Sequence, residues 1–322
     1  MAAAEQSPGD AVKIILDILR GDDQQMQTVA ISMAREMPGP EVTKALANEL
    51  PNLSSTCRVQ ILSALGDRGD KAALPAVIDA VKSKEGPVRV AALKALGRLG
   101  DASNVSLLAQ AAAKTVGEEQ KAARDSLYQL SDLNADGEIL KSIPKADASL
   151  KIELIRSVGE RNIAAGVSTL LITAKDSDRG VRTESFRILK VVAGPEHLPA
   201  LVRLLIDAQE PSDRTELQKT VAGVARKIQA ENRRAQAVLA VLPSVKETQS
   251  RCSLLSVLGQ IGDGSALPVL RTELGGTEVD VQTEAIRALA IWPTAEPLGD
   301  LLKLARERDN PLQKTLAQAV RR

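Results

Sequence analysis

A ten-residue pattern recurs along this 322-residue chain at a nearly constant spacing. It reads Val-Arg-Val-Ala-Ala-Leu-Lys-Ala-Leu-Gly at Val88–Gly97, and close variants occur at Cys57–Gly66 and Ser250–Gly259. A fixed period of this length is typical of stacked copies of one supersecondary unit, each burying its apolar face against its neighbours. The first residue of the pattern marks ten copies, 31 residues apart except for two spacings of 36 and 33: Met26, Cys57, Val88, Glu119, Leu150, Val181, Leu217, Ser250, Val281 and Leu312.

Within the copies, the residues four and eight places after the mark are almost all apolar. With the mark itself and the residue eleven places after it, they form one stripe of a helix of about twelve residues. Glycine follows the stripe in several copies, where it would let the last turn open and the next helix approach closely. The stripe residues are Ala30, Ile61, Ala92, Ala123, Leu154, Ser185, Val221, Leu254, Ala285 and Leu316, then Ala34, Leu65, Leu96, Leu127, Val158, Leu189, Ala225, Leu258, Leu289 and Val320.

A Gly-Asp corner follows the helix in three copies, at Gly69-Asp70, Gly100-Asp101 and Gly262-Asp263. The aspartate can cap a second helix by accepting its free N–H groups. Helices of this length joined by short turns must form antiparallel hairpins. We therefore predict an all-α fold, an α-solenoid of about ten helical hairpins of which the last is incomplete.

The array is expected to span residues 11–322, after a disordered or extended tail at residues 1–10. The spacing of 36 predicts a longer loop near residues 207–215. Because the first helix is apolar and the chain ends inside a hairpin, we expect the array to be a module of a larger protein.

The motif Val88-Arg-x-x-Ala-x-x-Ala-Leu-Gly97 resembles HEAT repeats, and among them the short HEAT-like type first associated with phycobilisome bilin lyases. The resemblance covers Ala11 to Arg322 and implies a superhelix whose marked helices line the concave side. It also implies a ladder of Arg–Asp pairs, yet only Asp176, Val181 and Arg182 match that motif in full. We therefore expect the polar residue after each mark to bond loop carbonyls one by one.

The charge is almost balanced, with 42 basic and 41 acidic side chains, which argues against a nucleic-acid partner. Cys57 and Cys252 stand six repeats apart, roughly 50 Å at 8–10 Å per step, so no disulfide within the chain is expected. Residues 1–10 lack the basic and apolar regions of a signal peptide, and no apolar run reaches about 18 residues. We expect a soluble chain without a membrane span, in a compartment that the sequence leaves unknown.

The position six places after the mark lies opposite the buried stripe and is predicted to be the most exposed. It holds several charged residues, and the position three places after the mark adds glutamates on the same side. Three Glu/Arg pairs result, each worth about 0.2–0.5 kcal/mol if it is only a solvated surface pair. The functional alternative is a concave mixed-charge groove that binds a protein or peptide, with these candidate residues: Lys94, Glu153, Arg156, Glu184, Arg187, Glu284 and Arg287.

No catalytic, cofactor-binding or metal-binding constellation emerges. His197 is the single histidine, which is too few for an ordinary zinc site or for the His/Glu-rich pattern of HEAT-like iron hydroxylases. The segment from Asn134 to Glu138 resembles part of a calcium loop but lacks the remaining oxygen ligands. We therefore predict a non-catalytic protein-interaction scaffold that needs no cofactor.

Two alternatives stay open. The resemblance implies a bilin lyase or isomerase, although the three aromatic residues (Tyr128, Phe186 and Trp292) are few for a tetrapyrrole pocket. A nucleic-acid-binding HEAT-like protein would use a modest cationic stripe: Arg156, Arg187, Arg226, Lys227 and Arg287.

Overall fold

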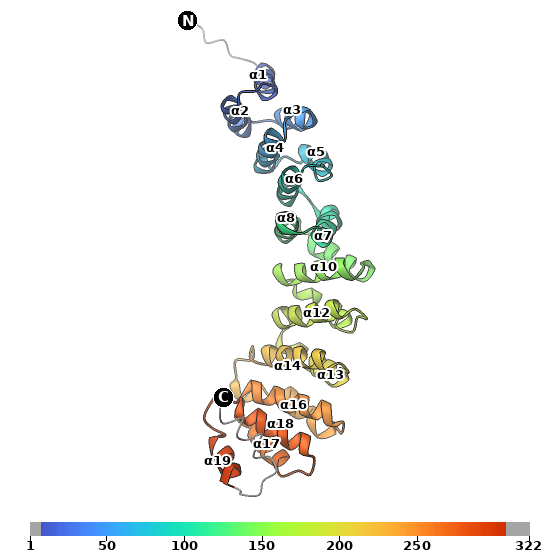
Figure 1. Cartoon of the computed structure of the whole chain (residues 1–322), viewed down its shortest axis with the longest axis vertical. Helices are drawn as coiled ribbons and strands as arrows, with labels where there is room; N and C mark the ends of the chain where they lie inside the picture. Colours follow the sequence, from blue (N-terminus) through green and yellow to red (C-terminus); the bar gives the residue numbers. More distant parts are fainter. Residues whose placement is uncertain (1–7, 307–322) are drawn as a thin grey trace. The chain divides into compact units, whose positions relative to one another are not determined.

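The computed structural model describes residues 8–306, and every regular element in that range is helical. The chain forms two compact units, Met1–Arg161 and Asn162–Arg322. Figure 1 shows paired helices in each unit, as an all-α solenoid requires. Helix α1 (Pro8–Arg20) begins inside the segment predicted as an extended tail, while residues 1–7 lie outside the described range. The incomplete tenth hairpin also lies outside it.

Each marked sequence in the described range forms a helix, and a second helix follows it. We call the first kind the marked helices. In unit 1 they are α2 (Gln24–Glu36), α4 (Ser55–Arg68), α6 (Gly86–Leu99), α8 (Gly117–Gln129) and α10 (Ala148–Glu160). The other helices of unit 1 are α1, α3 (Pro40–Glu49), α5 (Leu74–Ala80), α7 (Val105–Lys114) and α9 (Ala135–Ser142).

Unit 2 repeats this arrangement. Its marked helices are α12 (Arg179–Val192), α14 (Pro211–Ala225), α16 (Thr248–Ile261) and α18 (Val279–Ala290). Its other helices are α11 (Val167–Thr173), α13 (Leu198–Asp207), α15 (Gln236–Val241), α17 (Leu267–Leu274) and α19 (Leu298–Arg306).

The predicted stripe is the core of both units. The residues four and eight places after each mark are at most 1% exposed in the described range, from Ala30 in α2 to Leu289 in α18, whereas the mark Met26 is 46% exposed. Burial of small and aliphatic side chains between successive marked helices therefore supplies the main cohesion of each stack. The repeat register deduced from the sequence is confirmed.

Glycines near the ends of the marked helices permit close helix approach, as predicted. A Cβ at Gly97 would lie 2.7 Å from Cβ of Ser126, and one at Gly259 would lie 2.6 Å from Cα of Ala288. The last turn does not open at these glycines, however, because α6 continues to Leu99 and α16 to Ile261. Their role is to remove the Cβ where two backbones meet.

The corner aspartates cap as predicted. Asp70 accepts a hydrogen bond from N–H of Ala72, and Asp101 accepts one from N–H of Ser103. Asp263 does the same for Ser265 and also accepts from N–H of Ala235, 28 residues earlier in the chain.

The longer loop expected near residues 207–215 is wrong. Helix α13 ends at Asp207 and α14 begins at Pro211, so the connection is only residues 208–210. The inserted residues extend the start of α14, where Pro211 occupies the first turn, in which a proline needs no hydrogen-bond donor.

Candidate functional site

The residues six places after each mark point outward, as the helical period requires. We call them the outward row, and each unit has its own. In unit 1, Lys94 and Asp125 are exposed and Arg156 is partly exposed; in unit 2, Arg187 and Arg287 are exposed. The row thus carries long cationic side chains on rigid helices, two repeats apart in unit 1 (Lys94 and Arg156, with Asp125 between them) and three repeats apart in unit 2 (Arg187 and Arg287).

The glutamates three places after the mark do not share this exposure. Glu153 is 4% exposed and Glu184 is 9% exposed. The expected surface of alternating acidic and basic heads is therefore wrong in part. The helical wheel places these glutamates beside the outward row, but both are buried in the folded chain, which a pattern within one helix does not reveal.

Glu153 lies between two arginines. Its carboxylate accepts two hydrogen bonds of 2.7 Å from Nε and Nη2 of Arg124 in α8, and one of 2.6 Å from Nη1 of Arg156 in its own helix. A buried carboxylate needs such compensation to remain charged. Arg124 occupies a position that is aliphatic or aromatic in most other copies, and that departure was the sequence signal for this cluster.

In unit 2 the predicted pairs also form, within single helices. Arg187 donates from Nε to Oε1 of Glu184 at 2.9 Å, and Nη1 of Arg287 lies 3.3 Å from Oε2 of Glu284. Burial raises the pKa of Glu284, in spite of the opposing hydrogen bond from Arg287. All three predicted Glu/Arg pairs are thus confirmed as ion pairs, while their role in partner binding stays a prediction.

The polar residue directly after the mark bonds the preceding loop, as predicted. Gln27 donates to the carbonyls of Leu19 and Gly21, and Gln282 donates to those of Leu274 and Gly276. Each donor thus satisfies carbonyls that the end of the preceding helix leaves free.

Arginines at this position also reach a carboxylate further along the chain, which the sequence analysis missed. Arg89 donates from Nε and Nη2 to the two oxygens of Glu119, at 2.9 and 2.7 Å. Its Nη1 donates to the carbonyls of Ser83 and Lys84. Arg251 pairs in the same way with Glu273, and Nε of Arg182 donates to Asp213 at 2.7 Å. These are bidentate or charge-assisted bonds, which join neighbouring repeats for Arg89 and Arg182 and the two helices of one repeat for Arg251.

The corresponding bond of Arg58 is incomplete. Its Nη2 donates to Oε1 of Glu85 at 2.8 Å, while Nε of Arg58 and Oε2 of Glu85 are buried without a partner. These are the two unpartnered buried side-chain atoms found in the described part of the chain.

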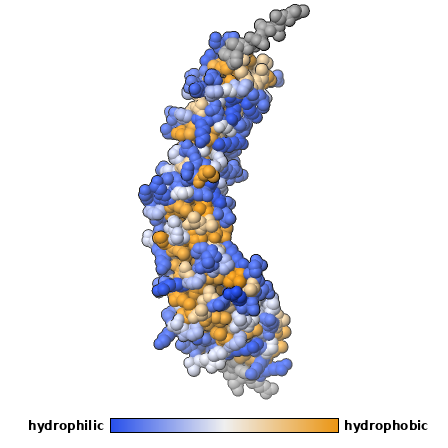
Figure 2. Space-filling view, turned by 180° about the vertical axis from the view of Figure 1, so that it is seen from behind, coloured by the Kyte–Doolittle hydropathy of each residue, from blue (hydrophilic) through white to orange (hydrophobic). Residues whose placement is uncertain are grey.

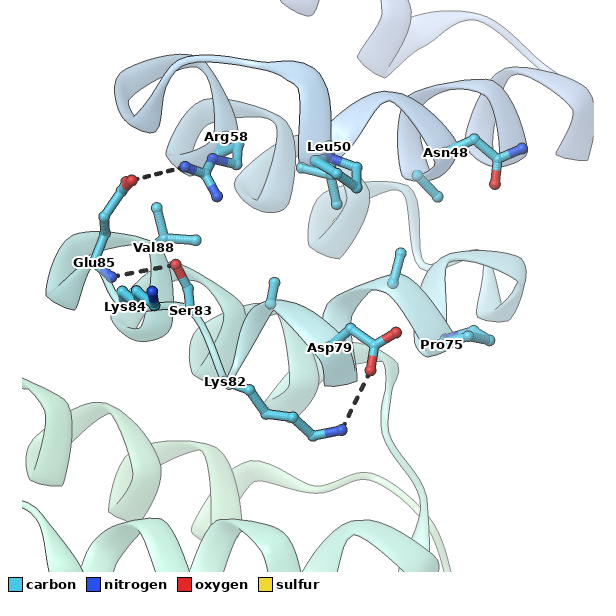
Figure 3. A pocket seen from close by; sticks show the side chains of 14 residues that line it. Asn48, Leu50, Arg58, Pro75, Asp79, Lys82, Ser83, Lys84, Glu85 and Val88 are labelled. Atoms are coloured by element: carbon cyan, nitrogen blue, oxygen red, sulfur yellow. Dashed lines mark hydrogen bonds and ion pairs between the residues drawn. The ribbon is translucent and has the colours of Figure 1, made fainter.

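A cleft of about 700 Å³ opens beside this pair in unit 1. It lies between α3 with the following turn (Leu50–Asn52) on one side and α5 with the loop at residues 82–85 on the other. In Figure 3, Arg58 and Glu85 lie at one end, while Asn48 and Pro75 lie toward the other. Its lining combines apolar side chains with a charged rim.

One face of the molecule is mixed in hydropathy. On the face seen in Figure 2, orange apolar areas lie among blue polar ones.

The cysteines, the histidine and the segment that resembles a calcium loop are explained by burial or by local hydrogen bonds and ion pairs. Cys57 is buried, and burial raises the pKa of its thiol; burial also raises the pKa of Cys252 to about 11. His197 accepts a hydrogen bond from N–H of Gly194 at 3.2 Å, within a helical turn. Asp136 lies in the segment that resembles a calcium loop, in the first turn of α9, and its carboxylate pairs with Arg161. Neither cysteine is poised as a nucleophile, because a thiol with a raised pKa stays protonated.

Two properties of the described residues limit what a site could hold. Within residues 8–306, no three histidine, cysteine, aspartate or glutamate side chains gather where a metal ion could bind. None of the helices in this range combines the length and apolar character needed to cross a membrane.

Residues 43–127 match the family of HEAT repeats. The other described marked helices keep the same register, with the same buried stripe. The match and the shared register support a HEAT-repeat protein. A comparison with curated protein sequences gave no significant match.

Solved structures share the fold. A mutant of Kap121p is similar with a TM-score of 0.54 and 11% identity, over 98% of this chain and 42% of that one. Human deoxyhypusine hydroxylase in complex with glycerol gives a TM-score of 0.35 and 20% identity, over 87% and 95% of the two chains. An engineered protein gives 0.37 and 20%, over 97% and 98%. At these identities the likeness concerns the helical solenoid alone.

Proposed function

We propose that this protein is a non-catalytic scaffold in which the outward row of each unit binds a polar segment of another protein. The observation that supports this most is the construction of the row. Its cationic heads stand on rigid helices, and the glutamates that hold Arg156 and Arg187 lie below the surface. A partner would therefore meet Arg156 and Arg187 already positioned, with little side-chain entropy left to lose.

The HEAT-repeat fold supports the same proposal. A solenoid of hairpins offers an extended surface whose shape is set by contacts between neighbouring repeats. Lys94 and Arg156 in unit 1, with Arg187 and Arg287 in unit 2, favour carboxylates on the partner, while Asp125 disfavours a uniformly acidic one. The partner surface is accordingly mixed in charge.

The test is capture of a partner by the full-length chain, with cross-linking to fix the site of contact. Lys94→Glu reverses an exposed charge of the row, and Arg287→Gln removes one while keeping a donor beside Glu284. Lys145→Glu, an equally exposed lysine in the turn after α9, is the matched control. We expect the two row variants to lose the captured protein and the control to retain it. Retention by all three variants would exclude the outward row as the binding surface.

Arg156 calls for a different substitution. Glutamate there would place a second carboxylate beside buried Glu153, which would report on stability rather than on binding. Arg156→Gln removes the charge and keeps a donor, and Arg124 still compensates Glu153. We expect weaker partner capture with an unchanged unfolding midpoint.

A further inference from the structure

The cleft beside α3 and α5 contains a hydrogen-bond donor and an acceptor that nothing in the described structure uses. They are Nε of Arg58 and Oε2 of Glu85, both buried and unpartnered. Figure 3 shows the two side chains together at one end of the cleft. Because an unsatisfied buried polar atom costs as much as a lost hydrogen bond, native proteins rarely keep two in one place.

The feature is specific to this repeat. Arg89, Arg182 and Arg251 occupy the same position in their copies, and in each of them Nε donates to a carboxylate. Each of them also donates to carbonyls of the preceding loop. Arg58 makes a single hydrogen bond, to Glu85. The Nε donor of its guanidinium, beside the cleft, therefore has no hydrogen-bond partner.

The chemistry of the pair indicates the kind of group that would complete it. An N–H donor beside a carboxylate acceptor is complementary to an amide, which presents one carbonyl and one N–H. The two side chains are 23% and 41% exposed, while Nε of Arg58 and Oε2 of Glu85 are covered, so a ligand would reach these two atoms by a rotation of both side chains.

The rim disfavours a charged ligand. A carboxylate would meet Glu85 and Asp79, while a cation would meet Arg58, Lys82 and Lys84. Lys82 is itself paired with Asp79, at 3.3 Å, which keeps the outer rim close to neutral. The ligand that fits is neutral and polar at one point.

The rest of the cleft accepts an aliphatic group. Leu50 and Val88 are buried beneath it, and Ala76 and Ala80 line it with short side chains that remain partly exposed. A volume of about 700 Å³ lies within the range of ligand pockets. Apolar contact would then supply affinity, and the amide would fix orientation.

We propose that this cleft binds an extended segment of a partner protein. A backbone amide of the segment bonds to Arg58 and Glu85, and an aliphatic side chain packs against Ala76 and Ala80. An extended segment is required because a helix uses its own amides internally. This rests on the proposed function in that the ligand is a protein, but it uses a surface separate from the outward row.

The experiment uses N-acetyl-leucinamide as a neutral amide probe on the full chain, with alanine methyl groups labelled with ¹³C. Methyl shifts of Ala47, Ala76 and Ala80 report occupancy of the cleft. N-acetyl-leucine and leucinamide carry the same side chain with a negative or a positive charge, and serve as matched probes. We expect a dissociation constant in the millimolar range for so small a ligand, at least about fivefold lower than for either charged probe.

Three variants separate the cleft from the outward row. Arg58→Lys keeps the charge and removes the Nε donor, and Ala80→Phe fills the cleft; both should reduce binding of the neutral probe at least about fivefold. Lys94→Glu should leave probe binding unchanged even where it abolishes partner capture. Circular dichroism checks that each variant is folded, and the three-probe comparison on the unmodified chain needs no variant at all. Equal binding of the three probes, or normal binding by folded Arg58→Lys and Ala80→Phe, would overturn the proposal and leave the scaffold function standing.

Discussion

Two neighbouring helix contacts in unit 1, between α4 and α6 and between α6 and α8, have nearly the same sequence but differ in how completely their arginine is hydrogen-bonded. Between α4 and α6, Arg58 makes one bond to Glu85, and a cleft opens at the edge. Between α6 and α8, Arg89 makes two bonds to Glu119 and two more to loop carbonyls. The difference shows that a repeat protein can keep its register and still vary the fit of each interface.

The position of the carboxylate explains the difference. Glu119 is the mark of its own copy and lies in the first turn of α8. Glu85 precedes its mark, Val88, by three residues and flanks the start of α6. A glutamate in a helix is held by the backbone, so it can meet both nitrogens of the guanidinium. A glutamate in a loop has no such restraint.

The largest expected effect comes from the close helix contact. Gly97→Ala should lower the free energy of unfolding by about 2 kcal/mol, because overpacking against Ser126 exceeds the gain of up to about 1 kcal/mol in helix propensity. Gly66→Ala is the matched control, since its Cβ would lie 3.2 Å from Cα of Ala95, where a small shift suffices. Urea unfolding measures both. Equal effects would show that the two interfaces pack alike.

The second effect concerns the helix caps. Asp101 accepts from both N–H and hydroxyl of Ser103, and the side chain of Asn104 accepts from the N–H of Asp101. Asp101→Ala should therefore cost about 1 kcal/mol, and Asp70→Ala somewhat less. Thermal unfolding of the two variants is the measurement. A larger loss of stability for Asp70→Ala than for Asp101→Ala would contradict the view that the contact between α6 and α8 is better fixed than that between α4 and α6.

The third effect tests the ion pairs directly. Glu119→Gln keeps the shape and removes the charge, and it should lower the unfolding free energy by less than about 1 kcal/mol, because the pair is partly exposed. Glu85→Gln should have a still smaller effect, since only one hydrogen bond is involved. Urea midpoints at low and high salt provide the comparison. A larger effect of Glu85→Gln would reverse the assignment of the complete and incomplete pairs.

The smallest effect is the pH dependence of the same pair. The hydrogen bonds from Arg89 lower the pKa of Glu119 in the folded chain. Its contribution to stability is then fully present above the ordinary pKa of about 4.3 and is lost as the pH falls through the folded value. The stability difference between wild type and Glu119→Gln should shrink between neutral pH and about pH 3. A difference that stays constant over this range would show that the charge of Glu119 contributes nothing.

Much of the architecture was predictable because it depends on local periodicity. The stripe from Ala30 to Leu289 repeats with the helical period, so the sequence alone assigns the buried face and the outward row. The capping aspartates and the pairs such as Glu153 with Arg156 were equally predictable, since their partners lie within three residues. The loop predicted near residues 207–215 is absent, because extra residues can lengthen a helix as easily as a loop.

Only the tertiary structure decided which side chains contact each other between repeats. Arg89 and Glu119 are 30 residues apart, and Arg124 and Glu153 are 29 apart, so no spacing rule within one helix reveals either contact. Burial of Glu153 and the open cleft beside Arg58 follow from the same fact. The sequence by itself determined the register, because the period of apolar residues within each helix assigns its buried face. The stacking of neighbouring helices decided which charged side chains are buried and where a cavity remains.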